Sequence, residues 1–62
     1  MIAKTAEVDS TVEVGLGSQI LHGAIIQVDA TVGEHSIINT GASIDHDCAI
    51  RHTVLPDQQI LF

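Results

Sequence analysis

A branched aliphatic residue recurs at every sixth position through most of the sequence. The nine positions are Ile2, Val8, Val14, Ile20, Ile26, Val32, Ile38, Ile44 and Ile50. The position four residues after each of them is small or of modest size, as at Ala6, Ser18 and Cys48. An α-helix has 3.6 residues per turn and cannot produce a strict period of six, and plain strand alternation does not explain why the two kinds of even position differ in size. The pattern therefore predicts a β-solenoid of hexapeptide repeats.

Each hexapeptide should form one short strand and one corner, so that three of them complete a triangular coil of about 18 residues. Coils stack at the strand spacing of about 4.8 Å, which places residue i beside residue i+18. The expected core ladders are Ile2/Ile20/Ile38, Val8/Ile26/Ile44 and Val14/Val32/Ile50. The predicted fold class is all-β, a parallel β-helix of about three coils that forms a single domain over residues 1–62.

The pattern stops at Pro56, where the next branched aliphatic residue would stand. Proline lacks the N–H group that a central strand donates to its neighbour. We therefore expect regular coils over residues 2–54 and an irregular tail over residues 55–62. Phe62 returns to the six-residue register, so we expect it to extend the Val8/Ile26/Ile44 ladder by one rung.

Composition limits the possible partners. Eight acidic residues stand against two basic ones, giving a net charge of −6. Binding to nucleic acid or to an anionic membrane surface needs clustered Lys and Arg, so neither is expected. The sequence has no apolar run of membrane-spanning length and no signal peptide at its start, which favours a cytoplasmic location.

The single cysteine and the short length also carry information. Cys48 cannot form a disulfide within the chain, and its register predicts a buried filler of space rather than a nucleophile. A chain of 62 residues with a thin core usually needs partner subunits. Three-sided coils pack most simply side by side, so we expect a homotrimer.

Candidate chemistry is concentrated in the stretch Asp45-His46-Asp47. Asp45 directly follows an inward isoleucine, and Asn39 does the same one hexapeptide earlier. A histidine between carboxylates can be a base whose tautomer a carboxylate fixes, a metal ligand, or a solvated residue of a polar turn. His46 and His52 are six residues apart, whereas metal-binding solenoids resembling the gamma-class carbonic anhydrases place their paired histidines about five apart. We therefore expect no metal site.

Residues 32–50, VGEHSIINTGASIDHDCAI, resemble one branch of the hexapeptide acyltransferases, which holds the sialic acid O-acetyltransferases and the UDP-amino-sugar N-acetyltransferases. The run from Ile38 to Ala42 and the tetrad Asp45-His46-Asp47-Cys48 carry the resemblance, which extends over residues 2 to about 50. It implies a left-handed coil in which His46 deprotonates a sugar amine or hydroxyl and Asp47 orients that histidine. It also implies that Asn39 and Asp45 contact the substrate, and that acetyl-CoA is the acetyl donor, bound between subunits of a homotrimer.

Several departures from that family are visible. The nucleotide-sugar-binding domain that precedes the family's coils is missing from this sequence, as are the coils that follow the tetrad. Arg51 stands at the position of a family glycine, and Leu55 stands where a second histidine is expected. We therefore expect a fragment or a truncated enzyme with an incomplete acetyl-CoA site, and whether it is an enzyme stays open. The alternative is a noncatalytic solenoid trimer that serves as an assembly or interaction module.

Overall fold

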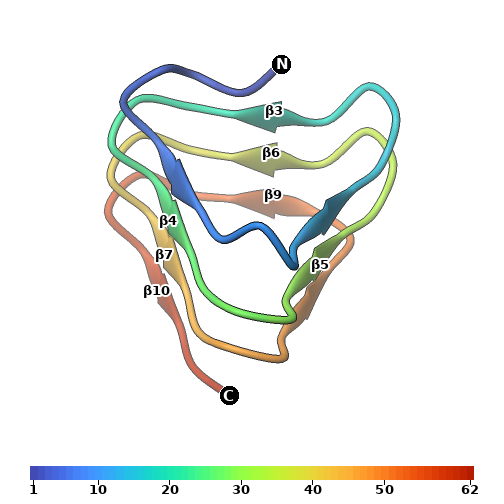
Figure 1. Ribbon diagram of the computed structural model, residues 1–62. Helices are drawn as coiled ribbons and strands as arrows, with labels where there is room; N and C mark the ends of the chain where they lie inside the picture. The colour runs from blue at the N-terminus through green and yellow to red at the C-terminus, as the bar shows by residue number, and fades with distance from the viewer.

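Each strand of the structure ends on a branched aliphatic side chain that points into the coil. The computed structural model describes residues 1–62 and contains ten strands of two residues each (Figure 1). They are β1 (Glu7–Val8), β2 (Glu13–Val14), β3 (Gln19–Ile20), β4 (Ile25–Ile26), β5 (Thr31–Val32), β6 (Ile37–Ile38), β7 (Ser43–Ile44), β8 (Ala49–Ile50), β9 (Thr53–Val54) and β10 (Gln59–Ile60). None of the elements is a helix of the length and apolarity that crossing a membrane requires.

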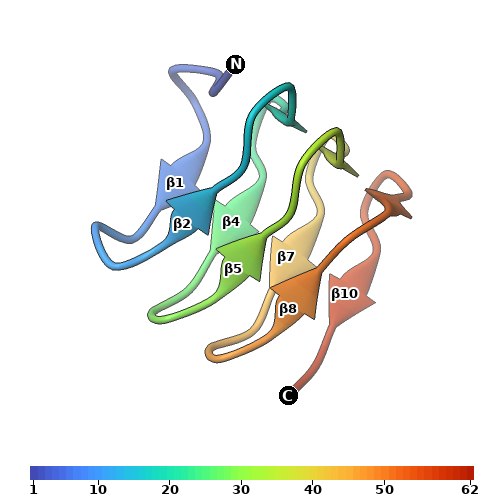
Figure 2. The same cartoon turned by 90° about the vertical axis from the view of Figure 1, so that its right-hand side faces the viewer.

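The strands form three parallel sheets, one on each side of the coil (Figure 1). The sheets have the orders β1-β4-β7-β10, β2-β5-β8 and β3-β6-β9, and successive coils lie beside one another along the axis (Figure 2). Val8 pairs with Ile26 and Ile26 with Ile44, which is the predicted offset of 18 residues. The other two predicted ladders are also present, one through Val14, Val32 and Ile50, the other through an isolated bridge from Ile2 to Ile20.

The coil is left-handed. In Figure 1 the chain runs counterclockwise from its N-terminus. Figure 2, the same molecule turned by 90°, shows that the N-terminal coil is nearest the viewer in Figure 1, so the chain recedes as it turns. A strand path that turns counterclockwise as it recedes has a left-handed sense, opposite to the usual parallel crossover. The predicted left-handed parallel β-helix is confirmed.

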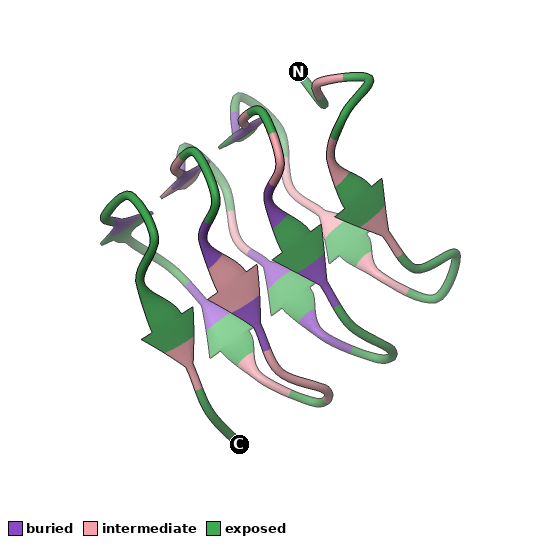
Figure 3. Ribbon diagram, turned by 90° about the vertical axis from the view of Figure 1, so that its left-hand side faces the viewer, coloured by how far each residue is buried: buried purple, intermediate pink, exposed green.

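The core consists of aliphatic ladders with alanines in the tight corners. Ile20, Ile26, Ile38 and Ile44 are at most 1% exposed, and Ala24, Ala30 and Ala42 are fully buried. Figure 3 shows that the buried residues lie in the middle coils and not at the two ends of the stack. Burial of an isoleucine side chain contributes about 1.5–3 kcal/mol to the free energy of unfolding. The coil therefore depends on regular stacking, because it contains no large aromatic side chain in its interior.

Most corners contain one residue with positive φ. These residues are Gly17, Gly23, Asp29, His35, Gly41, Asp47 and Asp57. Glycine adopts this left-handed conformation without strain, and aspartate and histidine tolerate it better than most residues do. The N–H groups of His35, Gly41 and Asp47 each donate to a carbonyl of the preceding coil at 3.0 Å. The corner therefore explains why glycine and aspartate recur every six residues.

The third coil is two residues shorter than the others. Only Arg51 and His52 connect β8 to β9, whereas four residues connect every other pair of successive strands. Ile38 pairs with Val54 and Ile44 pairs with Ile60, so the offset between coils falls from 18 residues to 16.

The short connection corrects the predictions for the C-terminal segment. The prediction that the regular sheet ends near Val54 is wrong, because β10 pairs with β7. Val54 is not a corner residue but continues the Ile20/Ile38 ladder, and it is fully buried. Ile60, not Phe62, extends the Val8/Ile26/Ile44 ladder, while Phe62 is 78% exposed. Pro56 lies in a corner turn, where its missing N–H group disrupts no ladder.

Candidate functional site

Asp45, His46 and Asp47 follow β7 and form the corner that leads to β8. Hydrogen bonds to both neighbouring coils hold the backbone of this corner. The Asp45 N–H donates to the Ile60 carbonyl at 2.8 Å, and the Asp47 N–H donates to the Val28 carbonyl at 3.0 Å. The His46 N–H donates to Oδ1 of Asp45 at 2.8 Å, so the side chain of Asp45 stabilises the start of the turn.

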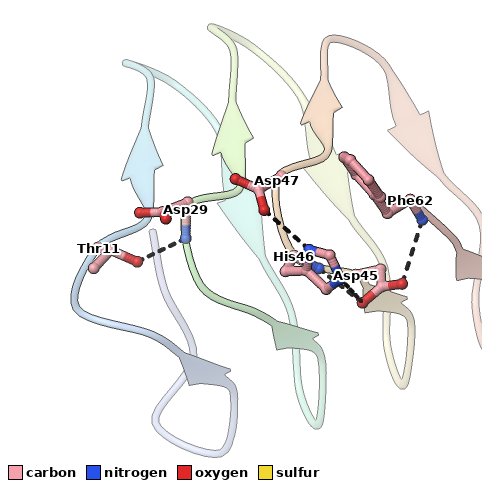
Figure 4. A network of polar contacts seen from close by, with 6 residues as sticks. All are labelled: Thr11, Asp29, Asp45, His46, Asp47 and Phe62. Carbon is pink, nitrogen blue, oxygen red and sulfur yellow. Dashed lines mark hydrogen bonds and ion pairs between the residues drawn. The ribbon is translucent and has the colours of Figure 1, made fainter.

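The imidazole of His46 lies between the two carboxylates (Figure 4). Its Nδ1 is 2.9 Å from Oδ2 of Asp47, a hydrogen bond in which the ring N–H donates to the carboxylate. Its Nε2 is 3.9 Å from Oδ1 of Asp45. The contact with Asp47 fixes the neutral ring in the Nδ1–H tautomer, which leaves the lone pair of Nε2 available to accept a proton. The His46 side chain is 46% exposed, so a molecule from solution can reach it.

The neighbouring groups stabilise the charged forms of the site. The hydrogen bond to Asp47 raises the pKa of His46 above its ordinary value and outweighs desolvation, which lowers it; the negative charges of Asp45 and Asp47 add weaker effects in the raising direction. The pKa of Asp45 is lowered by the backbone N–H groups of His46 and Phe62, which donate to its carboxylate. The corner is therefore built to hold an imidazolium beside two carboxylates.

Phe62, which follows β10 in the next coil, packs beside the same corner, a contact that the sequence pattern did not predict. Its ring centroid is 4.9 Å from that of His46 with an angle of 32° between the ring planes. Its backbone N–H also donates to Oδ2 of Asp45 at 3.3 Å (Figure 4). A fixed offset of 18 residues places Phe62 opposite Ile44, and only the observed offset of 16 brings it to His46.

Asn39 is not brought to His46 within one chain. It lies at the start of the corner before β7, whereas His46 lies in the corner after β7. Its backbone bonds to Val54 and Ala42, and its side chain makes no hydrogen bond within the chain. Cys48 is a free, partly buried thiol that packs against the core, in agreement with the filler role expected of it.

The surface near the corner is only slightly hollowed. A recess of about 170 Å³ on the outer side of the β4, β7 and β10 strands is lined by Gln27, Ser43, Asp45, Gln59, Ile60 and Leu61. A wider and more open hollow of about 670 Å³ lies over β1 and β4 and does not include His46. No group of three His, Cys, Asp or Glu side chains is arranged to hold a metal ion.

No model of a known protein family matches the sequence, and searches of curated proteins and of solved structures also find no match. The hexapeptide β-helix therefore rests on the period of the sequence and on the observed coils, and the functional assignment must come from the chemistry of the corner.

Proposed function

We propose that this chain carries the general base of an acetyl-CoA-dependent acetyltransferase whose acceptor is the amine or hydroxyl of a sugar, either a sialic acid or a UDP-amino-sugar. The observation that carries the proposal is the 2.9 Å contact between His46 Nδ1 and Asp47 Oδ2 beside an accessible Nε2. The resemblance of residues 32–50 to the sugar acetyltransferases supplies the reaction class.

In the proposed reaction, Nε2 of His46 takes the proton of the sugar amine or hydroxyl while that group attacks the thioester carbonyl. The tetrahedral intermediate then collapses, the C–S bond breaks, and the imidazolium returns its proton to the departing thiolate. Asp47 interacts more strongly with the imidazolium than with the neutral ring, so its contribution is largest where the base is charged. The raised pKa of His46 is consistent with this role.

Substrate contacts are proposed for Asp45 and Asn39. Asp45 borders the recess beside β7, where its carboxylate can accept a hydrogen bond from a sugar hydroxyl. Asn39 is at the opposite end of β7 from His46, so we propose that the two share a site only across an interface of the expected homotrimer. The chain offers the phosphates of acetyl-CoA only Lys4 and Arg51 as basic side chains, so we expect weak binding of the donor.

The test is incubation of the protein with millimolar acetyl-CoA and a panel of sialic acids and UDP-4-amino-sugars, followed by mass spectrometry. We expect an acetylated product with the intact protein and none with His46→Ala. His52→Ala is the matched control, because His52 is exposed in the β8–β9 connection and its side chain makes no hydrogen bond. Absence of product, together with no acetyl-CoA binding by calorimetry, would overturn the proposal.

A noncatalytic role in assembly is the second candidate, and one surface favours it. The outward positions of the β3-β6-β9 sheet carry no charge, although the chain as a whole has a net charge of −6. These positions, which we call the uncharged face, are Gln19, Leu21, Ile37, Asn39, Thr53 and Leu55. Such a face suits packing against another subunit better than exposure to water. Under this alternative the protein forms a trimer that binds no acetyl-CoA.

A further inference from the structure

The position of Phe62 follows from the short β8–β9 connection. Ile44 pairs with Ile60, so continuing the same register by two residues places Phe62 directly beside His46 in the next coil. In a coil of the usual length, Phe62 would instead stand opposite Ile44 and point into the core. The connection through Arg51 and His52, which is two residues shorter than the others, thus moves Phe62 from a core position to a place beside the candidate base.

One hydrogen bond to Asp45 and one ring contact with His46 hold Phe62 in this place. The N–H of Phe62 donates to Oδ2 of Asp45 at 3.3 Å, while Oδ1 of the same carboxylate accepts the N–H of His46 at 2.8 Å. Asp45 therefore links the backbones of the two residues whose rings stack at 4.9 Å. In Figure 4 the phenyl ring and Asp47 lie on different sides of the imidazole.

A half-exposed histidine side chain would otherwise exchange among several rotamers. In most of these rotamers Nδ1 of His46 would lie away from Asp47, because the backbone of the corner restricts the position of the Asp47 carboxylate. A ring packed on one face of the imidazole removes those alternatives and leaves the opposite face and the Nε2 edge for a ligand. Aromatic pairs favour such offset or tilted arrangements.

We propose that Phe62 is a positioning residue for His46, which holds the imidazole in the rotamer that bonds to Asp47, and that the shortened β8–β9 connection places it there. The consequence for catalysis rests on the proposed function, whereas the effect on the imidazole does not. The titratable side chains that act on the ring are Asp45 and Asp47, both on its own corner (Figure 4). The side chain of Phe62 is uncharged.

The primary test is NMR spectroscopy of the His46 imidazole in the absence of any substrate. In the unmodified protein we expect ring-current shifts of the imidazole protons and nitrogen shifts of a single Nδ1–H tautomer. Phe62→Leu keeps an apolar side chain outside β10 but removes the ring, so these shifts should move toward those of a free imidazole and the pKa of His46 should fall. Leu61→Ala is the matched control, because Leu61 is also exposed and precedes Phe62 directly.

A second variant tests the origin of the contact. Insertion of Gly-Asp between Arg51 and His52 restores a coil of the usual length, and we expect it to remove the ring-current shifts from His46 although Phe62 is still present. Unchanged imidazole shifts and pKa in Phe62→Leu would overturn the inference, whatever the insertion does. If the acetyltransferase activity exists, Phe62→Leu should lower kcat several-fold with little change in KM for acetyl-CoA. If the NMR effects appear but no transfer occurs, only the proposed function fails.

Discussion

Asp47 combines a backbone requirement with a side-chain contact. Its φ of 61° matches that of Asp29 and Asp57 at equivalent corner positions. An aspartate at this position is therefore explained by the turn alone and does not indicate a site. What distinguishes Asp47 is the 2.9 Å contact of its carboxylate with His46. The two other aspartates have no histidine beside them in their own turns, so the functional argument depends on the pair and not on either residue alone.

The pH dependence of His46 follows from the direction of its pKa shift. We expect Asp47→Asn to lower the pKa of His46, because an amide cannot stabilise the imidazolium as a carboxylate does, while asparagine still tolerates positive φ. The proposed acetyl transfer requires the neutral base, so its rate should rise with pH through the raised pKa of His46, and the midpoint should move to lower pH in the variant. An NMR titration of the imidazole measures the pKa directly, with Asp29→Asn as the control. An equal midpoint in the two proteins would contradict the assigned role of Asp47.

The raised pKa of His46 also determines the direction in which the stability of the fold changes with pH. The pKa of His46 is higher in the folded chain than in the unfolded one, whose value is about 6.5. The contribution of protonated His46 to the stability of the fold is therefore fully present at pH values below the pKa of the unfolded chain. It is lost as the pH rises through the pKa of His46 in the folded chain. Because the groups are exposed, we expect the effect on unfolding to be small.

At this scale, sequence reasoning could group Asp45, His46 and Asp47 because they are adjacent in the chain. It could not find Phe62, which reaches His46 only through the offset of the third coil. It also joined Asn39 to His46 from the resemblance alone, and the three-sided coil separates these residues by the corner 39–42 and β7.

At the scale of the elements, the six-residue period predicted β1 to β8 because a constant four-residue connection follows each of the first seven strands. The period resumes after the short connection, since Val54 and Ile60 are again six residues apart. The sequence contained this signal, but Val54 also fitted the small corner position of the uninterrupted register. Only the pairing of the strands shows whether Val54 is a ladder residue or a corner residue, because both positions place its aliphatic side chain inside the coil.

The short connection leaves a buried hydroxyl without a partner. Oγ of Ser18 accepts the N–H of Ser36 at 3.0 Å and donates to the Gly33 carbonyl. Ser36 occupies the equivalent position one coil later, where the next corner is two residues shorter, and its Oγ has no hydrogen-bond partner.

We expect Ser18→Ala to lower the free energy of unfolding by about 1–3 kcal/mol, because it leaves the buried N–H of Ser36 without an acceptor. Ser36→Ala removes an unpaired polar atom and should be neutral or stabilising by up to about 1 kcal/mol. Urea denaturation followed by circular dichroism compares the two variants. A larger loss for Ser36→Ala than for Ser18→Ala would show that the Ser36 hydroxyl is paired in solution.

At the scale of the whole molecule, the chain buries few side chains for its length. Only 12 of its 62 residues are buried, and in the N-terminal coil Ile2 is 51% exposed although it lies on a core ladder. A small coil with such a thin core gains stability from association with other subunits. The expected homotrimer remains a prediction, and the uncharged face is the surface on which it can be tested.

We expect light scattering to give a trimer for the unmodified protein and a smaller species for Leu55→Glu. Leu55 lies on the uncharged face and is 61% exposed, so a glutamate there introduces charge without disturbing the core. Leu16→Glu is the control, since Leu16 is 78% exposed in the corner between β2 and β3, outside that face. A stable monomer of about 6.6 kDa for the unmodified protein would contradict the trimer.

The short connection at Arg51–His52 has a consequence for how such chains can diverge. A change of two residues in one connection moves each downstream residue to another position of the six-residue repeat, as Phe62 moves from an inward position to one beside a corner. It thereby exchanges the partners that each downstream residue meets in the preceding coil. A β-helix can thus acquire a new side-chain neighbour for an existing residue, as His46 meets Phe62 here, without any point substitution at either position.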